Sequence, residues 1–140
     1  MRGEYAERSL KADEEFGFEG EHNCMPYLKQ LVPDIHKNGR WAKIDFESED
    51  TYLELKTRRM KRNKWETTLM PCDKIRPGKK NILVFNFTDE LCYIVYNDRL
   101  FNSFEKRLFV CKDRGNPQDK EKLHYFIPVH CLTTLHRWTI

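Results

Sequence analysis

Two neighbouring runs of β-branched and aromatic residues constrain the fold of this chain more than any other feature. Residues 81–87 (NILVFNF) and 91–96 (LCYIVY) are separated only by the polar turn Thr88-Asp89-Glu90. Runs of this length and composition on either side of a short polar turn are typical of a β-hairpin. The chain is therefore expected to contain a β-sheet to which this hairpin belongs.

Further strands and helices are expected around this hairpin. Apolar Ile44 and Phe46 alternate with polar neighbours, and Leu53 and Leu55 do the same, which is the period of a strand. The expected elements are a helix over 4–31 interrupted near 17–20 and ended by Pro33, strands over 41–46, 51–58, 81–87, 91–96, 107–112 and 123–129, and a short helix from His130.

This order of elements predicts an α/β (α+β) fold with a central mixed β-sheet flanked by helices. Residues 1–140 are expected to form a single domain, because the length is ordinary for one domain and no repeat or Gly/Ser linker divides the chain. The 39% hydrophobic and 13% aromatic residues can form a core and argue against disorder.

The cysteines and histidines argue against several classes of protein. The five cysteines are scattered and form no C-x-x-C pair, and the five histidines have no metal-binding spacing, so a zinc site is not expected. No apolar run reaches the ~20 residues that a bilayer span needs. The prediction is a soluble, intracellular protein of a reducing compartment, cytoplasm or nucleus, with no membrane partner.

Charge is distributed unevenly along the chain. The formal net charge is only +3, but six of the nine residues in 56–64 (KTRRMKRNK) are Lys or Arg, whereas the first 25 residues are acidic. A basic cluster of this kind fits either a polyanionic partner or an ordinary solvated face.

The strands over 41–46 and 51–58 can bring charged side chains together. Side chains two apart on a strand share a face, so Glu54 and Lys56 lie together, opposite to Leu53 and Leu55. If the intervening turn has an even number of residues, Asp45 joins them on the polar face. Two carboxylates and an ammonium are suited to phosphodiester hydrolysis with Mg²⁺, although a cross-strand ion pair at an exposed sheet edge is the plainer alternative.

At this point the chain resembles a known family. Lys43-Ile44-Asp45-Phe46, a short acidic turn, and the sequence from Tyr52 to Arg59 are similar to the active-site hairpin of the PD-(D/E)XK nuclease superfamily. Phe18-Glu19-Gly20-Glu21 resembles the start of the helix that supplies a further acidic residue in many members. The resemblance covers roughly residues 16–74 and implies a restriction-endonuclease-like core.

The resemblance implies roles for individual residues. Glu21, Asp45, Glu54 and the Leu55 carbonyl would bind Mg²⁺, with Mn²⁺ as a substitute, and Lys56 would orient or activate water, so that the catalytic set is Asp45, Glu54, Lys56 and Glu21. Glu14, Glu15 and Glu19 are alternatives to Glu21. Asp34, which follows Pro33, is an alternative to Asp45, but it is expected in a loop, whereas Asp45 lies in a strand beside Glu54.

The implied substrate is nucleic acid, with DNA favoured over RNA. A chain this short leaves little room for a separate specificity domain, so the open alternatives are a homodimer that cuts both strands and dependence on a partner. The phosphate backbone would contact Arg58, Arg59, Lys61, Arg62, Lys64 and Lys74. The family often has a helix bordering the site where residues 65–75 follow, which makes Thr67 and Thr68 secondary candidates. Trp65 is expected in the core beside Leu69 and Met70, with stacking on a base of a single strand as the alternative.

Two other functions stay open beside a metal-dependent endonuclease. The chain could be a catalytically silent nucleic-acid-binding or assembly module on the same scaffold, although it retains Asp45, Glu54 and Lys56 together. It could also be an ordinary interaction domain in which the E-x-K sequence is a coincidence. Binding of magnesium separates the nuclease from the interaction domain, and turnover separates it from the silent module.

Overall fold

Two β-sheets form most of the structure, a computed structural model that describes residues 20–39, 41–111 and 120–139. The six-stranded sheet has the order β1 (His36–Lys37), β2 (Phe46–Glu47), β3 (Thr51–Thr57), β5 (Lys80–Asn86), β6 (Glu90–Val95) and β9 (Thr133–Arg137). The three-stranded sheet has the order β4 (Thr67–Pro71), β8 (Lys120–Pro128) and β7 (Glu105–Cys111).

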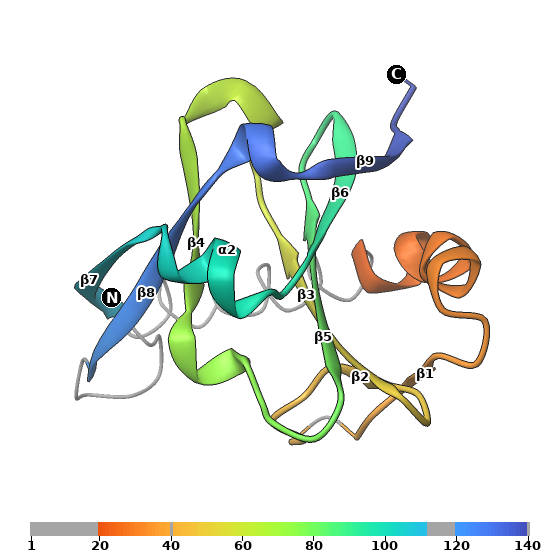
Figure 1. Cartoon of the computed structure of the whole chain (residues 1–140). Helices are drawn as coiled ribbons and strands as arrows, with labels where there is room; N and C mark the ends of the chain where they lie inside the picture. Colours follow the sequence, from red (N-terminus) through yellow and green to blue (C-terminus); the bar gives the residue numbers. More distant parts are fainter. Residues whose placement is uncertain (1–19, 40, 112–119, 140) are drawn as a thin grey trace, which may run out of the picture.

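Few helices accompany these sheets. A helix runs through residues 20–31, and α2 (Asp98–Asn102) is a short helix between β6 and β7. Three 3₁₀ turns are η1 (Arg62–Lys64), η2 (Cys72–Lys74) and η3 (Val129–Cys131). Figure 1 shows the helix of residues 20–31 on one side of the six-stranded sheet and the three-stranded sheet with α2 on the other.

The six-stranded sheet therefore separates two hydrophobic cores. On the helix side, Leu53 and Leu55 of β3 and Val84 of β5 pack with Cys24 and Leu28 of the helix. On the other side, residues of β5 and β6 pack against the second sheet and α2, namely Leu83, Phe85, Phe87, Cys92, Ile94, Met70, Phe101, Phe104, Tyr125, Ile127 and Leu132. Alternate side chains of β5 thus enter opposite cores, as the pleat of a strand requires.

A crossover joins β3 to β5, which lie side by side and parallel. Parallel neighbours need a long connection, usually a helix. Here the connection is η1, β4 and η2, so the helix expected over residues 65–75 is wrong. Thr68 and Met70 are buried and their neighbours in β4 are partly exposed, which is the period of a strand against a core.

The prediction of a mixed α/β class with a central mixed sheet is confirmed, and so are its two later strand pairs. β5 pairs with β6 and β7 with β8, both antiparallel. The short final helix is wrong, because η3 is a single turn and β9 then pairs with β6. In the first strand expected over 41–46, only Phe46 is in β2.

The N-terminal helix was predicted to extend from residue 4 to residue 31. The predicted helix over residues 4–19 lies outside the described residues, while residues 20–31 are helical and the helix ends before Pro33. Within the described ranges, no helix is both long and apolar enough to span a bilayer.

Candidate functional site

The hairpin of β2 and β3 brings the predicted acidic residues to neighbouring positions. Phe46 lies opposite Leu53, and Glu47 lies opposite Tyr52. Continued by one residue, this antiparallel register puts Asp45 opposite Glu54, because the turn contains an even number of residues. Opposite residues of an antiparallel pair share a face.

Asp45 is held directly against β3. The backbone N–H of Leu55 donates a hydrogen bond of 3.0 Å to Asp45 Oδ2. Asp45 therefore stands at the strand that carries Glu54 and Lys56, although β2 proper begins one residue later. The alternative Asp34 is elsewhere, since its carboxylate is exposed and accepts from the backbone of Glu49 at 3.3 Å.

Glu54 is a buried carboxylate between two lysines. Its side chain is 5% exposed, and its Oε1 lies 3.4 Å from Lys56 Nζ and 3.3 Å from Lys74 Nζ. Burial raises the pKa of Glu54 above its ordinary value and the nearby Asp45 charge raises it further, while Lys56 and Lys74 lower it. The two lysines thus do not fully compensate a carboxylate that is costly to ionise.

A divalent cation would suit this arrangement. Two neighbouring carboxylates that repel each other are stabilised together by one positive ion, and Mg²⁺ is usually held by one or two carboxylates, waters and substrate phosphate. Asp45, Glu54 and the Leu55 carbonyl supply hard oxygen ligands of this kind. The set is a minimal one, because no group of three or more His, Cys, Asp or Glu residues suited to a metal occurs in the described part of the chain.

The crossover covers the site with residues that were secondary candidates. Lys74 reaches Glu54 from η2, and Thr68 is buried on β4. Because β4 and η2 lie over the Glu54 face of β3, Glu54 is in the interior, and the alternative of an ion pair at an exposed sheet edge does not describe it.

Glu21 approaches the same strand but has another partner. A side chain at Gly20 would lie 2.8 Å from Thr57 Oγ1, so a glycine permits the helix to approach the end of β3. The Glu21 carboxylate is paired with Lys37 of β1 at 2.5 Å. The helix packs on the face of the sheet that carries Leu53, which is opposite to the face that carries the Glu54 side chain. That Glu21 is a metal ligand therefore stays a prediction. Its alternatives Glu14, Glu15 and Glu19 lie outside the described residues.

A pocket of about 340 Å³ opens beside Lys56. Its basic members are Lys56, Arg58, Lys61 and Arg62; its other members are Met60, Trp65, Thr67, Thr68, Leu69, Pro71, Phe87, Phe109, His124 and Val129. The basic sequence after β3 therefore forms one wall of a pocket that starts at the predicted catalytic lysine.

The predicted nucleic-acid-binding residues differ in exposure. Arg59, Lys61 and Lys64 are exposed, whereas Arg58 and Arg62 are partly buried. Arg58 Nη2 donates to the Leu69 carbonyl at 2.6 Å and so ties β3 to β4. Exposed cations of this kind are accessible to a phosphate backbone.

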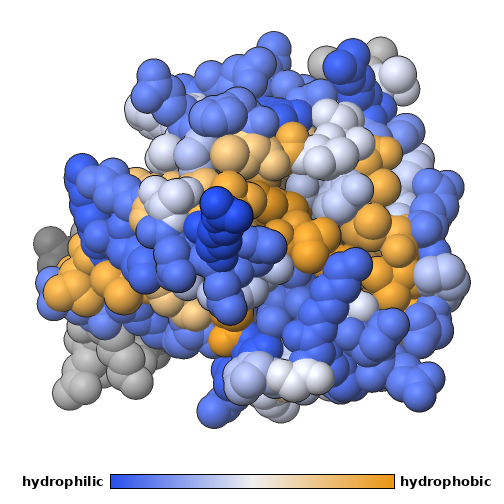
Figure 2. All heavy atoms as spheres, viewed as in Figure 1, coloured by the Kyte–Doolittle hydropathy of each residue, from blue (hydrophilic) through white to orange (hydrophobic). Residues whose placement is uncertain are grey.

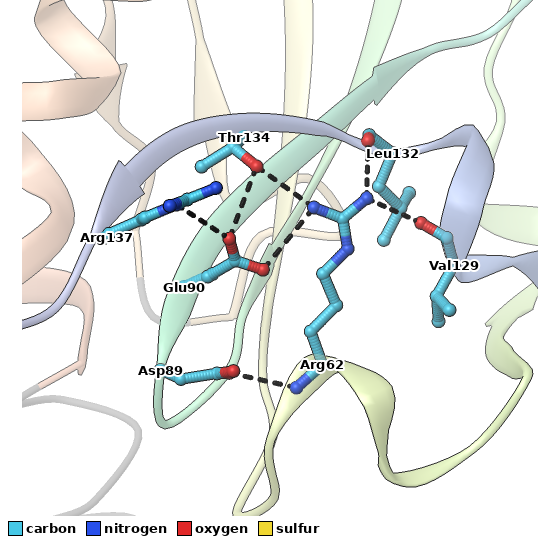
Figure 3. Close-up of polar contacts among 7 residues, drawn as sticks. All are labelled: Arg62, Asp89, Glu90, Val129, Leu132, Thr134 and Arg137. Atoms are coloured by element: carbon cyan, nitrogen blue, oxygen red, sulfur yellow. Dashed lines mark hydrogen bonds and ion pairs between the residues drawn. The ribbon is translucent and has the colours of Figure 1, made fainter.

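Arg62 is held by a network that Figure 3 shows in full. Its guanidinium donates to the carbonyls of Val129 and Leu132 at 2.8 and 2.7 Å and to Thr134 Oγ1 at 3.0 Å. It also lies 3.4 Å from Glu90 Oε2, and its backbone N–H donates to Asp89 Oδ1 at 2.9 Å. These bonds fasten η1 to β6 and to the segment before β9.

His124 and Phe109 are among the pocket residues that sequence reasoning did not find. His124 is 3% exposed, its Nδ1 lies 2.8 Å from the Lys122 carbonyl, and its ring meets that of Phe109 edge-on at 5.7 Å. Both come from the β7–β8 hairpin, which is distant in sequence from Lys56. A strand pair can be recognised locally, but which sheet it joins depends on tertiary packing, so no local signal pointed to these residues.

Comparisons of the chain with protein-family models, with curated proteins and with solved structures found no match.

Proposed function

We propose that this chain is a Mg²⁺-dependent nuclease of the PD-(D/E)XK type, with DNA favoured over RNA as the substrate. The observation that carries the proposal is the Asp45 carboxylate on the Leu55 N–H, next to Glu54 in the chain, with Lys56 and Lys74 against the Glu54 carboxylate. A buried carboxylate whose pKa is raised by burial and by a neighbouring like charge is characteristic of functional sites.

Asp45, Glu54 and the Leu55 carbonyl would hold the metal ion. A bound Mg²⁺ would lower the pKa of its water and stabilise negative charge on the phosphate. The hydrogen bond from the Leu55 N–H orients Asp45 for this role. Lys74 counterbalances the Glu54 carboxylate from the crossover at 3.3 Å, and a bound cation would share that carboxylate with it.

Lys56 serves the substrate side of the site. It borders both Glu54 and the pocket, and its side chain is 30% exposed, so its ammonium can reach water or phosphate. In the proposed reaction it orients the attacking water and stabilises charge that develops on the phosphate. Arg59, Lys61 and Lys64 add sequence-independent contacts to the backbone.

The arrangement of elements supports a restriction-endonuclease-like core in part. The hairpin with the predicted motif, the preceding helix that approaches Thr57, and the crossover from β3 to a parallel β5 agree with the resemblance. The crossover differs from it, because a strand and two 3₁₀ turns stand where a helix is usual. The proposal therefore rests on the site more than on the fold.

A silent nucleic-acid-binding or assembly module is the second candidate. It is favoured by the small number of acidic ligands among the described residues and by the two lysines that already contact Glu54. In that case the pocket and its basic wall would bind nucleic acid, and the Glu54 pairs would serve only stability.

Cleavage assays separate these two functions. Purified wild type, Lys56→Ala and the control Lys29→Ala are incubated with labelled single- and double-stranded DNA and RNA in Mg²⁺, Mn²⁺ or EDTA. Lys29 is an exposed lysine on the helix, away from Glu54. Metal-dependent cleavage by wild type and Lys29→Ala that is lost in Lys56→Ala supports the nuclease. Binding of nucleic acid without cleavage of any substrate refutes it.

A further inference from the structure

The pocket beside Lys56 combines cations with exposed aromatic rings. Trp65 and Phe109 line it, and their exposed fractions are 61% and 49%. Trp65 was expected in the core, and the structure overturns that expectation. Exposed apolar side chains that gather around a pocket mark a candidate binding site for a ligand.

The Trp65 ring stands on a rigid support. The Arg62 network fixes η1 immediately before it (Figure 3), and the carbonyl of the next residue, Glu66, accepts from the Val129 N–H at 2.9 Å. The backbone on both sides of Trp65 is thus fastened to the segment around η3. A side chain on a fixed backbone at an open pocket loses less conformational freedom on binding than one on a mobile loop, and Lys64 Nζ, 5.8 Å from the centre of the Trp65 ring, brings a cation beside it.

Phe109 comes to the same pocket from the second sheet. It lies on β7, in a hairpin on the side where Figure 2 shows orange, hydrophobic atoms among blue ones, and the exposed hydrophobic residues of this hairpin include Leu108, Val110 and Leu123. Among these residues, Phe109 is the one that lines the pocket, and its ring rests edge-on against buried His124. The pocket therefore has aromatic members from two separate parts of the fold.

The remaining walls indicate the chemistry of the ligand. Met60, Leu69 and Phe87 are apolar, while Lys56 and Lys61 supply positive charge. A groove that contacted only the phosphates of a duplex would need the cations but neither the apolar wall nor the exposed rings. An apolar, aromatic pocket with cations beside it matches a nucleotide whose base face is accessible and whose phosphate is negative.

We infer that the pocket between Trp65 and Phe109 binds an unpaired base, and that the chain acts on single-stranded nucleic acid or on an unpaired segment. This inference rests on the proposed function for the position of the scissile phosphate near Lys56. In a duplex the base faces are stacked on one another, so Trp65 would have no ring to contact unless a base were extruded. In a single strand every base has an accessible face. The protein should therefore prefer single strands to duplexes without preferring a base sequence.

Binding measured in EDTA tests this inference without cleavage. Fluorescence anisotropy gives the affinity of a short labelled single strand, as DNA and as RNA, and of a blunt DNA duplex. The variants are Trp65→Ala, Phe109→Ala, the conservative Trp65→Phe and the control Leu108→Ala, which removes an exposed side chain next to Phe109 that does not line the pocket. Circular dichroism checks that each variant is folded.

The expected result is preferential binding of the single strand by wild type. Trp65→Ala and Phe109→Ala should weaken that binding by roughly 5- to 150-fold, the range for loss of stacking on one base. Trp65→Phe should keep most of the affinity, Leu108→Ala should equal wild type, and duplex affinity should change little in any variant.

Two results would overturn the inference. One is equal affinity of wild type for single strand and duplex, and the other is an equal loss for both in the alanine variants. These outcomes are independent of the nuclease proposal. Selective binding of the single strand without any metal-dependent cleavage would refute the nuclease proposal and leave the base-binding pocket in place. Cleavage of duplex alone, at the same rate by wild type and Trp65→Ala, would refute the base-binding pocket and leave the nuclease proposal in place.

Discussion

Two clusters of polar side chains lie at opposite ends of the basic sequence, one around buried Glu54 and one around partly buried Arg62, and they differ in how well their charges are matched. The Glu54 cluster consists of Asp45, Glu54, Lys56 and Lys74, and the Arg62 cluster of Arg62, Asp89, Glu90 and Thr134. In the Arg62 cluster, donors meet acceptors at 2.7 to 3.4 Å, and Arg137 adds a second cation at 3.3 Å from Glu90. In the Glu54 cluster, a like charge faces the buried carboxylate and its pKa is raised.

Under the proposed function, the Arg62 cluster serves the fold and the Glu54 cluster serves the activity. Buried polar groups that are fully hydrogen-bonded stabilise one arrangement of segments, as Arg62 does for η1, β6 and β9. A buried carboxylate beside another carboxylate costs stability in the absence of a ligand, and such groups persist where a ligand compensates them. Substitutions in the two clusters should therefore have opposite consequences for activity and stability.

The largest expected effect is on cleavage, from Asp45→Asn. Asparagine can still accept the hydrogen bond from the Leu55 N–H, so folding should be preserved while an anionic metal ligand is lost. Since a catalytic metal supplies several kcal/mol of transition-state stabilisation, single-turnover rates in Mg²⁺ should fall by at least roughly 100-fold. The control Glu49→Gln, in the exposed turn of the same hairpin, should cleave as wild type does. An unchanged rate in Asp45→Asn would remove Asp45 from the site.

The next effect is on stability, from Arg62→Ala. This substitution leaves the Val129 and Leu132 carbonyls without their donor and Glu90 without one of its two cations. Urea denaturation should show a loss of roughly 3 kcal/mol, because buried acceptors and a buried charge lose their partners. Arg99→Ala on the exposed surface of α2 should change stability by less than about 0.5 kcal/mol. Equal stabilities would mean that the Arg62 cluster contributes nothing to the fold.

A smaller effect is expected in the dependence of stability on pH. Because the pKa of Glu54 is raised in the folded state above its ordinary value of 4.5, the native protein binds the proton more tightly than the unfolded chain. Its contribution to stability is therefore complete below pH 4.5 and is lost as pH rises through the folded-state pKa.

Thermal unfolding in EDTA measures this contribution against Glu54→Gln, which does not titrate. The variant should gain stability relative to wild type as pH rises through that window, by on the order of 1 kcal/mol, which is usual for a relieved functional site. A difference that does not change with pH would show that Glu54 is no more strained than an ordinary carboxylate.

The smallest effect is expected for Lys61→Ala, which removes one exposed cation from the pocket wall. Each phosphate contact to a single strand contributes about 0.7 to the slope of log affinity against log salt. The slope for a single-stranded oligonucleotide should decrease by about that amount, with a loss of affinity that does not depend on base sequence. Lys29→Ala should keep the wild-type slope, and the same slope in Lys61→Ala would exclude a phosphate contact there.

Local patterns predicted the parts of this molecule that depend on local sequence. The alternation around Phe46 and Leu53 and the polar turn between them were sufficient for the hairpin and its face assignment, because register follows from turn length. The two later strand pairs were predicted for the same reason. In residues 67–71 the apolar Leu69 and Met70 are adjacent, so the sequence shows no alternation there, and the family resemblance favoured a helix.

The rest of the site depends on contacts between distant segments. The burial of Glu54, the approach of Lys74 and the position of Phe109 arise because the crossover and the second sheet cover one face of β3. The alternation of a strand predicts which side chains share a face, but it does not predict which other segments pack on that face. The exposure of Trp65 was missed because apolar Leu69 and Met70 nearby suggested a core, whereas the turn before β4 directs the chain to the surface.

The effect of Mg²⁺ on thermal stability, with and without the Glu54 carboxylate, tests the central comparison most directly. Thermal unfolding of wild type and Glu54→Gln is recorded at neutral pH in EDTA and in saturating Mg²⁺. The account predicts that Glu54→Gln is the more stable protein in EDTA, and that Mg²⁺ raises the Tm of wild type and not of the variant, because a ligand stabilises only the state that binds it. No Mg²⁺ shift in wild type, together with a less stable Glu54→Gln, would contradict it and would make the Glu54 cluster a structural ion pair.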